Sequence, residues 1–337
     1  MLKQKRTWLG IFFIVFTFYF LFRNLNFARL LDNLGHFHIF WILPALAVYL
    51  LGYVLRGYRW VILMSPIKRC SFSSLFPTLI IGFMMNNLLP ARLGEIYRAY
   101  HNGTKEGVSR SASLATILLE RLFDGLTMIV ALWAALSFAR LPIKVQSMPA
   151  GIQHAIQWSP WVFGAAFVFC FALLIFKKTA VATMNYFISH APAQYHEVLT
   201  KIGHTFIDGL QVLQNAKESI GVMVLSLLAW GCEFTSYYFI AIGFSLAPSP
   251  LNLWSAALLM AVANLGILIP NAPGGIGLFE FIGVALLLPY GIPKETAVGY
   301  MFLLHFLLLI PITLMGLYFF SREGLRFKDI GKKEMAP

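Results

Sequence analysis

Residues 271–280 read NAPGGIGLFE and interrupt an otherwise apolar region of the chain. One apolar run, 253–270, precedes this stretch, and another begins at Phe281 and continues to Leu288. Proline and glycine break helices, because proline lacks the amide proton and glycine disfavours helical backbone. Both types are concentrated here, as Pro270, Pro273, Gly274, Gly275 and Gly277. The sequence therefore predicts two helical arms joined by a broken segment that ends near the carboxylate of Glu280.

The composition indicates what surrounds this break. The chain has 337 residues, is 59% hydrophobic and 12% charged, and has a mean hydropathy of +0.73. Several apolar runs reach the roughly 17–25 residues that cross a bilayer, so we expect an all-α, polytopic integral membrane protein. A net charge of +12 is then better explained by basic residues beside anionic lipid headgroups than by a nucleic-acid partner. The three cysteines are far apart, and neither a disulfide framework nor a metal or cofactor site is expected.

A broken helix within a membrane is a strong constraint. Lipid cannot satisfy the backbone groups that a break exposes, so such a segment must lie inside protein or beside water. An ionisable residue among apolar helices, here Glu280, is a functional candidate. A short extramembrane loop between two spans is the alternative. The second arm is short for a span, which favours a re-entrant hairpin over about 253–288.

A second break resembles the first. The apolar arm 75–89 has about 15 residues, which is marginal for a crossing. It contains Asn86, runs into Pro90, and is followed by Gly94 and Glu95, so a hairpin is expected over about 75–100. Each hairpin thus joins an apolar arm to Pro, Asn and Gly and then to a Glu. Broken helices in corresponding positions of two inverted halves point to a midplane transport site. As a repeat this similarity is weak, and chance is the alternative.

The remaining apolar runs predict six full spans. They lie at about 8–22, 39–54, 113–138, 161–176, 220–246 and 296–320, with an amphipathic surface segment at about 179–219. If both hairpins return to their side of entry, 20 Lys and Arg residues lie on the side of the termini and five on the other. The positive-inside rule then predicts cytoplasmic termini, with the two hairpins entering from opposite faces. We expect residues 1–337 to form a single membrane domain.

The first break is followed by charged residues. Arg92, Glu95 and Arg98 are spaced three apart, so on a helix they share one face. Two guanidinium groups can clamp a phosphate, with Glu95 orienting them. The alternative is an interfacial cluster that anchors the hairpin.

Further charges lie inside apolar helices. Each isolated charge at mid-membrane costs roughly 2.5–3.5 kcal/mol on insertion scales, so Glu120, Arg121 and Asp124 should pair with each other or with a hairpin. An Arg121–Asp124 salt bridge would leave Glu120 as the freer group. Glu233 lies among aromatic residues, where it could carry a proton, bind an amine or accept a hydrogen bond from a tyrosine. His305 is interpreted as an ordinary helix residue.

Three motifs carry a family resemblance. NNLLPARLGEIYRA (86–99), ERLFDG (120–125) and PGGIGLFE (273–280) together resemble the membrane region of lysylphosphatidylglycerol synthetases and related flippase-like proteins of bacteria and archaea, over roughly 8–320. In two-domain members this region is taken to move aminoacylated phosphatidylglycerol between leaflets, while a soluble domain makes the lipid. The resemblance implies the translocating part without the synthase, in a cell (inner) membrane. It leaves the lipid open, polyprenyl-linked sugars included.

We therefore expect a lipid translocase rather than an enzyme. Its partner would be a lipid with an anionic or aminoacylated headgroup, whose phosphate Arg92 and Arg98 would hold. Glu120, Asp124 and Glu280 would receive a cationic group or a coupled proton, and the broken segment from Asn271 to Gly277 would supply open backbone groups and hinges.

The first alternative is a membrane-embedded glycosyl- or phospho-transferase acting on a lipid-linked substrate. Its carboxylates, Glu95, Glu120 and Asp124, would bind a metal or act as bases. A partner subunit or scaffold is the third interpretation.

Overall fold

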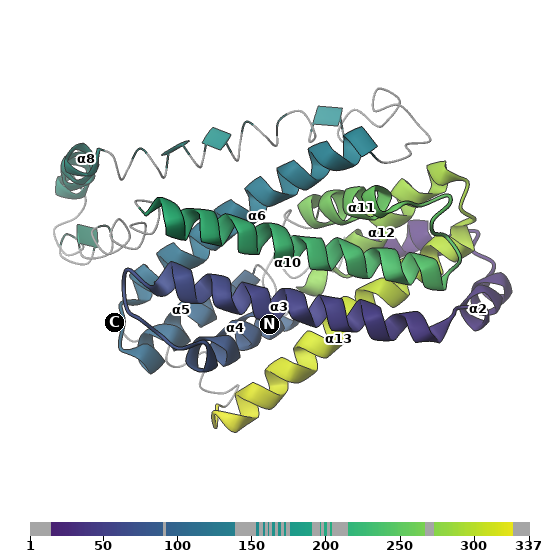
Figure 1. The fold of residues 1–337 in the computed structure, drawn as a ribbon, viewed down its shortest axis with the longest axis horizontal. Coiled ribbons are helices and arrows are strands. Elements are labelled where there is room, and N and C mark those ends of the chain that lie inside the picture. The colour runs from purple at the N-terminus through teal and green to yellow at the C-terminus, as the bar shows by residue number, and fades with distance from the viewer. Residues whose placement is uncertain are drawn as a thin grey trace.

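The computed structural model describes residues 15–89, 92–138, 176–190, 215–266 and 273–325, with scattered positions between 153 and 203. These residues form helices joined by short connections, and no strand occurs among them (Figure 1). The helices are α2 Phe27–Gly35, α3 Ile42–Met64, α4 Phe72–Leu88, α5 Leu93–Glu106, α6 Arg110–Phe138, α8 Lys177–Ser189, α10 Ala216–Gly243, α11 Leu253–Gly266, α12 Leu278–Leu287 and α13 Lys294–Arg322. Residues 15–22 are helical as well.

Four described segments are long and apolar enough to cross a membrane. They are Ile39–Met64, Ala216–Gly243, Pro273–Tyr290 and Lys294–Arg322. α6 has 29 residues, about 43 Å at 1.5 Å per residue, but it carries the charged motif. The all-α, polytopic membrane architecture is confirmed, and the number of six full spans stays a prediction.

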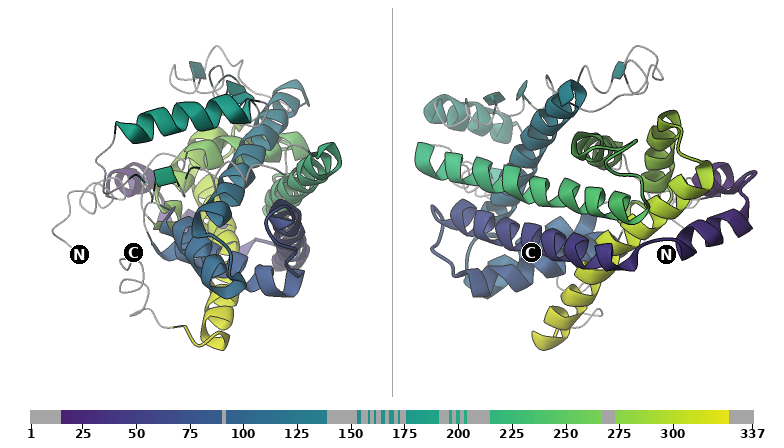
Figure 2. Two further views of the ribbon diagram at one scale, coloured as in Figure 1. Left: turned by 90° about the vertical axis from the view of Figure 1, so that its left-hand side faces the viewer. Right: turned by 45° about the vertical axis from the view of Figure 1, so that its right-hand side comes forward.

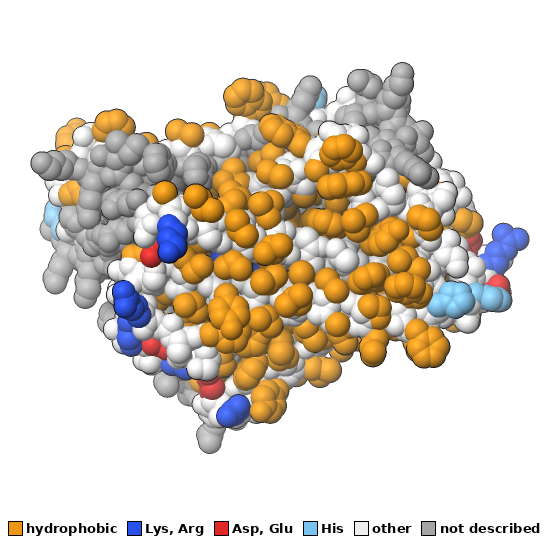
Figure 3. All heavy atoms as spheres, viewed as in Figure 1, with side chains coloured by type: hydrophobic (Ala, Val, Ile, Leu, Met, Phe, Trp, Pro, Cys, Tyr) orange, Lys and Arg blue, Asp and Glu red, His pale blue; other side chains and the backbone are white. Residues whose placement is uncertain are grey.

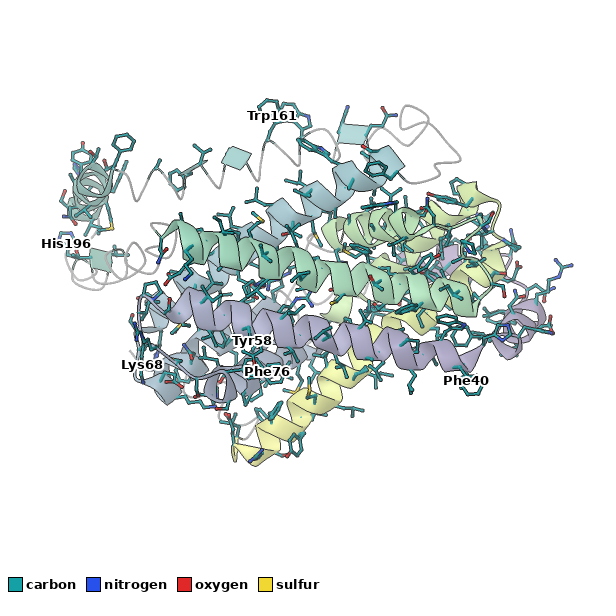
Figure 4. The ribbon with its side chains drawn as sticks, viewed as in Figure 1. Phe40, Tyr58, Lys68, Phe76, Trp161 and His196 are labelled. Carbon is teal, nitrogen blue, oxygen red and sulfur yellow. The ribbon has the colours of Figure 1, made fainter. Side chains whose placement is uncertain are left out.

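The surface agrees with a membrane setting. Figure 3 shows apolar side chains across the middle of one face and charged side chains or histidines towards its two ends. Large apolar residues such as Leu43, Leu51 and Leu228 are at least half exposed. Such a surface is unusual for a soluble protein and suits contact with lipid. Figure 4 places Lys68 and Phe40 towards opposite ends of this band.

The core of the bundle is built around α3 and α10, which lie side by side in Figures 1 and 2. Pro44 occupies the first turn of α3, where its missing amide proton costs no helical hydrogen bond. Gly52 of α3 allows close approach, since a Cβ added there would lie 3.2 Å from the carbonyl oxygen of Ala229. α13 crosses this pair obliquely, with α4 packed against it.

The two predicted hairpins enter from opposite ends. α4 and α5, the first hairpin, open to the end where α3 ends and α6 begins (Figure 1). α11 and α12, the second hairpin, open to the other end, where α10 ends and α13 begins. An inverted repeat would have this arrangement, but the repeat itself stays a prediction.

One predicted boundary is wrong. The span expected to end near residue 54 continues to Met64, and both Arg56 and Arg59 are buried within it. They do not belong to the flanking basic patch, although the remaining basic residues keep the same bias. The predicted span 161–176 and most of 179–219 lie outside the described residues, where only α8 is continuous.

Candidate functional site

The two hairpins meet where their helices are broken. Gly274 of the second hairpin lies against Asn87 of the first, so that a Cβ added to Gly274 would be 3.4 Å from the Asn87 carbonyl oxygen. Both hairpins are also held by α13. The Asn87 amide donates to the hydroxyl of Thr313 at 3.0 Å, and the Gly274 carbonyl oxygen lies 3.0 Å from Nε2 of His305. α13 is therefore a common support for both breaks.

The second break depends on its glycines. Gly274, Gly275 and Gly277 have φ angles of 66°, 76° and 90°, a left-handed region that side chains with a Cβ seldom adopt. Glu280 closes the start of α12, because one of its oxygens accepts the Gly277 N–H at 2.8 Å. The other oxygen lies 2.6 Å from Nδ1 of His305. Glu280 is thus buried and fully partnered. Pro273 begins the described part of this segment, and Asn271 lies outside it.

Arg92 lies at the first break, just outside the helix that contains Glu95 and Arg98. Arg92 has φ 54° and precedes α5, a conformation uncommon for a residue other than glycine. Its side chain is 39% exposed and lies 3.8 Å from Glu95. The spacing predicted that Arg92, Glu95 and Arg98 share one continuous helical face. They do not, because Arg92 lies outside the helix. Asn86 is part-buried, and the neighbouring Asn87 provides the contact with α13.

Glu120 is the centre of the buried charges. Arg98 donates to both of its oxygens, at 3.1 and 2.8 Å, and Arg121 donates to one at 2.6 Å. Nη2 of Arg59 lies 3.3 Å from the same carboxylate. The Glu120 side chain is completely buried. The prediction that Glu120 is the freer group is therefore wrong, and Arg98 is not available to a ligand.

Asp124 is held by more than the predicted partner. Arg121 lies 3.3 Å from it, which confirms that salt bridge. Arg59 is closer, at 2.5 Å, and the indole N–H of Trp230 donates to the same oxygen at 2.8 Å. Arg59 also donates to Ser226 at 2.8 Å. Sequence reasoning missed Arg59, which joins α3, α6 and α10.

Glu233 pairs with a residue that the sequence placed elsewhere. Arg56 donates to it at 2.7 Å, and Asn264 donates to its other oxygen at 3.3 Å. The Arg56 guanidinium lies 5.1 Å from the Tyr53 ring centre and 4.9 Å from that of Trp230. An ion pair therefore takes the place of the tyrosine hydrogen bond, which was one of the three alternatives for Glu233. One signal could have revealed it: apolar residues resume at 61–64, soon after Arg59, so the apolar segment does not end at residue 54.

These residues form one charge network with an excess of one cation. Its members are the five arginines Arg56, Arg59, Arg92, Arg98 and Arg121 and the four carboxylates Glu95, Glu120, Asp124 and Glu233. The partly exposed members are Arg92, Arg121 at 27% and Glu95 at 19%. Among the described residues, the network atoms buried without a hydrogen bond include Oε1 of Glu95 and Nε of Arg121, together with atoms of Arg56, Arg59, Arg98 and Asp124. The partly exposed side of the network lies next to the first break, since Arg92 directly precedes α5.

The described residues contain no group of side chains with the arrangement of a metal site. The network offers instead guanidinium groups of fixed position. Such groups bind phosphate or carboxylate through paired hydrogen bonds.

The fold and this network define a class: a polytopic helical membrane protein with two opposed, broken hairpins around buried ion pairs. Residues 7–316 match the family model of the lysylphosphatidylglycerol synthase TM region, and the chain belongs to this family. The resemblance expected from the three motifs is thereby confirmed.

Relatives lie among archaeal membrane proteins. The UPF0104 membrane protein MJ1078 of Methanocaldococcus jannaschii is 26% identical over 70% of this chain and 92% of its own length. The UPF0104 membrane protein PH1989 of Pyrococcus horikoshii is 25% identical over 77% of this chain and 79% of its own. Glycosyltransferase AglD of Haloferax volcanii is 22% identical over 71% of this chain but only 42% of its own length. No solved structure matches the chain.

Proposed function

We propose that this protein is a lipid translocase that moves a phosphate-bearing lipid between membrane leaflets. The observation that supports it best is the contact between two broken hairpins that enter from opposite ends. Opposed broken helices that meet inside a bundle are typical of transporter sites, where open backbone groups and hinges come together. The exposed side of the charge network adjoins this contact through Arg92, which precedes α5 directly.

The phosphate is assigned to Arg92 and Arg121. Arg98, the residue first expected, has both terminal nitrogens on Glu120. Arg92 and Arg121 are partly exposed and both approach Glu95, at 3.8 and 3.6 Å. Glu95 thus orients two guanidinium groups, and the excess cation of the network favours an anion. Every carboxylate in the network already has an arginine partner, so none is left for an ammonium group.

The orientation follows from the basic residues. They are concentrated in the connections at the end of the bundle where α3 ends and α6 begins, and in the two termini. By the positive-inside rule, this end and both termini would face the cytoplasm of a bacterial or archaeal cell.

The test is a leaflet assay in proteoliposomes. The probe is fluorescent phosphatidylglycerol, and the measured quantity is its rate of exchange between leaflets with wild type and with Arg92→Gln. Loss of one charge-assisted hydrogen bond predicts a rate about tenfold lower. Arg110→Gln is the matched control, since Arg110 stacks on Tyr100 at 4.3 Å at the start of α6, outside the network. Wild-type exchange no faster than in protein-free vesicles would refute the translocase. A folded Arg92→Gln with unchanged exchange would refute the phosphate site alone.

A second candidate is a transferase acting on a lipid-linked substrate, which the similarity to glycosyltransferase AglD favours. Glu95 is the carboxylate best placed to act as a base, since its side chain is 19% exposed whereas those of Glu120 and Asp124 are only 0% and 7% exposed. Metal-dependent product formation by the purified protein, absent in Glu95→Gln, would support this activity.

A further inference from the structure

We propose that Glu280 and His305 form a proton-binding site that latches the second hairpin to α13. The site is a chain of three groups: Oε1 of Glu280, the imidazole ring, and the carbonyl oxygen of Gly274. Nδ1 lies 2.6 Å from the carboxylate oxygen and Nε2 lies 3.0 Å from the carbonyl oxygen. The ring thus joins α12, α13 and the broken segment before α12.

The geometry sets the number of protons. A carbonyl oxygen only accepts, so Nε2 must carry a hydrogen to bond Gly274. A neutral ring then has a lone pair on Nδ1, which faces Glu280. The contact is favourable if Nδ1 is also protonated, or if Glu280 is protonated and donates to it. Either way, the pair holds one proton more than a neutral imidazole and an ionised carboxylate.

Loss of that proton breaks one particular contact. The ring's single remaining hydrogen goes to the carboxylate, since hydrogen bonds to charged groups are the stronger ones. Glu280 itself stays in place, because its other oxygen accepts the Gly277 N–H at 2.8 Å. Nε2 then directs a lone pair at the Gly274 carbonyl, and the two repel. Gly274 is the residue that touches Asn87 of the first hairpin, so release of the proton loosens the contact between the hairpins.

Protein encloses both members of the pair. Both side chains are nearly fully buried, at 6% and 3% exposure, and the Phe279 ring lies 4.5 Å from the imidazole. Titratable groups on the described neighbouring elements include two phenols: the Tyr237 ring of α10 lies 6.3 Å from that of Phe279, and Tyr49 of α3 donates to the Leu308 carbonyl oxygen of α13 at 2.8 Å. The Arg56–Glu233 ion pair is linked to this region through Asn264, which approaches Tyr237. Residues 267–272 contain no titratable side chain.

A latch of this kind couples the proposed translocase to a proton gradient. This part of the inference rests on the proposed function. Binding a proton from one side of the membrane closes the hairpin contact, and releasing it to the other side opens it. A proton gradient then biases the direction in which the hairpins alternate.

Amide hydrogen exchange of residues 273–279 tests the latch without any lipid. In wild type, exchange corrected for its intrinsic pH dependence becomes about tenfold faster as the pH rises and the proton leaves, because one hydrogen bond is lost. In Glu280→Gln the new amide donates to Nδ1 and the ring donates from Nε2, so this segment stays protected at every pH. In His305→Leu it exchanges fast at every pH. His101→Gln is the control. The His101 ring lies 2.6 Å from Glu323, and this pair is not part of either break.

The outcomes separate the latch from the translocase. If the corrected amide exchange rate of wild type does not change with pH, and Glu280→Gln exchanges at the same rate, the latch is overturned. A working latch without exchange of fluorescent phosphatidylglycerol supports the proton site and refutes the translocase. Lipid exchange could slow in Arg92→Gln and yet remain unchanged by an imposed pH gradient and by Glu280→Gln. That result would overturn the proton coupling and leave the translocase proposal intact.

Discussion

Arg98 and Glu120 form a two-pronged buried ion pair, with N–O distances of 3.1 and 2.8 Å and side chains only 3% and 0% exposed. The guanidinium also lies 3.7 Å from the ring centre of Trp60. One pair thus ties the first hairpin, through α5, to α6 and to α3. Neither charge can turn to water, so each depends on its partner for stabilisation.

We predict that Glu120→Gln destabilises the protein more than any other single change in the charge network. It leaves Arg98 without its partner and removes the nearest carboxylate of Arg121. Breaking a buried pair by removing one member costs about 3–5 kcal/mol. Arg98→Met should cost less than Glu120→Gln, because Glu120 keeps the charges of Arg59 and Arg121. Thermal unfolding in detergent measures both.

Arg92→Met is the control for this ranking. The Arg92 side chain is 39% exposed and its carboxylate partner is 3.8 Å away, and exposed pairs of this kind contribute at most about 1 kcal/mol. Equal losses in Glu120→Gln and Arg92→Met would contradict the assignment of Glu120 as the centre of the network.

The sequence predicts the two helix breaks well because their signals are local. Proline and glycine break helices wherever they occur, whereas the re-entrant course of the hairpins stays a prediction. Pro273, Gly274 and Gly277 therefore mark the second break without knowledge of the fold. The Arg121–Asp124 bridge is local too, since the two residues are three apart on one helix.

The pairings between helices are not local, and there the sequence fails. Arg56 and Arg59 end an apolar run and carry charge, so they are easily assigned to a membrane flank. Their burial depends on Glu233 and Asp124, which are distant in the chain. His305 shows the same limit, because its role appears only when α13 lies against Glu280.

We predict that Gly94→Ala disrupts the first hairpin. A Cβ at this position would lie 2.1 Å from the carbonyl oxygen of Gly82 and 2.7 Å from the backbone nitrogen of Asn86. Backbone atoms cannot rotate away, so α5 must move off α4. Overpacking of this kind costs about 1–3 kcal/mol, which thermal unfolding would detect. Gly35→Ala is the control, with nothing within 4 Å of the added methyl group. A stability equal to that of the control would show that the close helix crossing is absent.

We predict that Cys70 alkylates slowly at mildly alkaline pH and faster as the pH approaches 11. Burial, together with the thiol's hydrogen bond to Glu106 at 3.4 Å, raises the pKa of Cys70 to about 11. Only the thiolate reacts. Glu106→Gln removes a nearby negative charge and should lower that pKa, so the reaction becomes faster. Peptide mass spectrometry after iodoacetamide gives the rate at Cys70 alone. Glu323→Gln removes a carboxylate at the same end of the bundle and should leave the alkylation rate of Cys70 unchanged. An equal acceleration in Glu323→Gln would mean that the effect comes from loss of packing at this end and not from the Glu106 charge.

The headgroup preference is the last prediction, and it distinguishes two of the lipids that the family resemblance leaves open. Unlabelled phosphatidylglycerol should compete with the fluorescent probe in the leaflet assay, whereas its lysylated form should compete about tenfold less well. The reason is that Arg92 and Arg121 offer cations while each carboxylate of the network already contacts an arginine. An added ammonium group would therefore meet no unpaired carboxylate and would approach an excess of positive charge. A tenfold lower affinity corresponds to about 1.4 kcal/mol of binding free energy. Equal competition by both lipids would mean that Glu95 leaves Arg92 to receive the ammonium. In that case Glu95→Gln would weaken the lysylated competitor selectively.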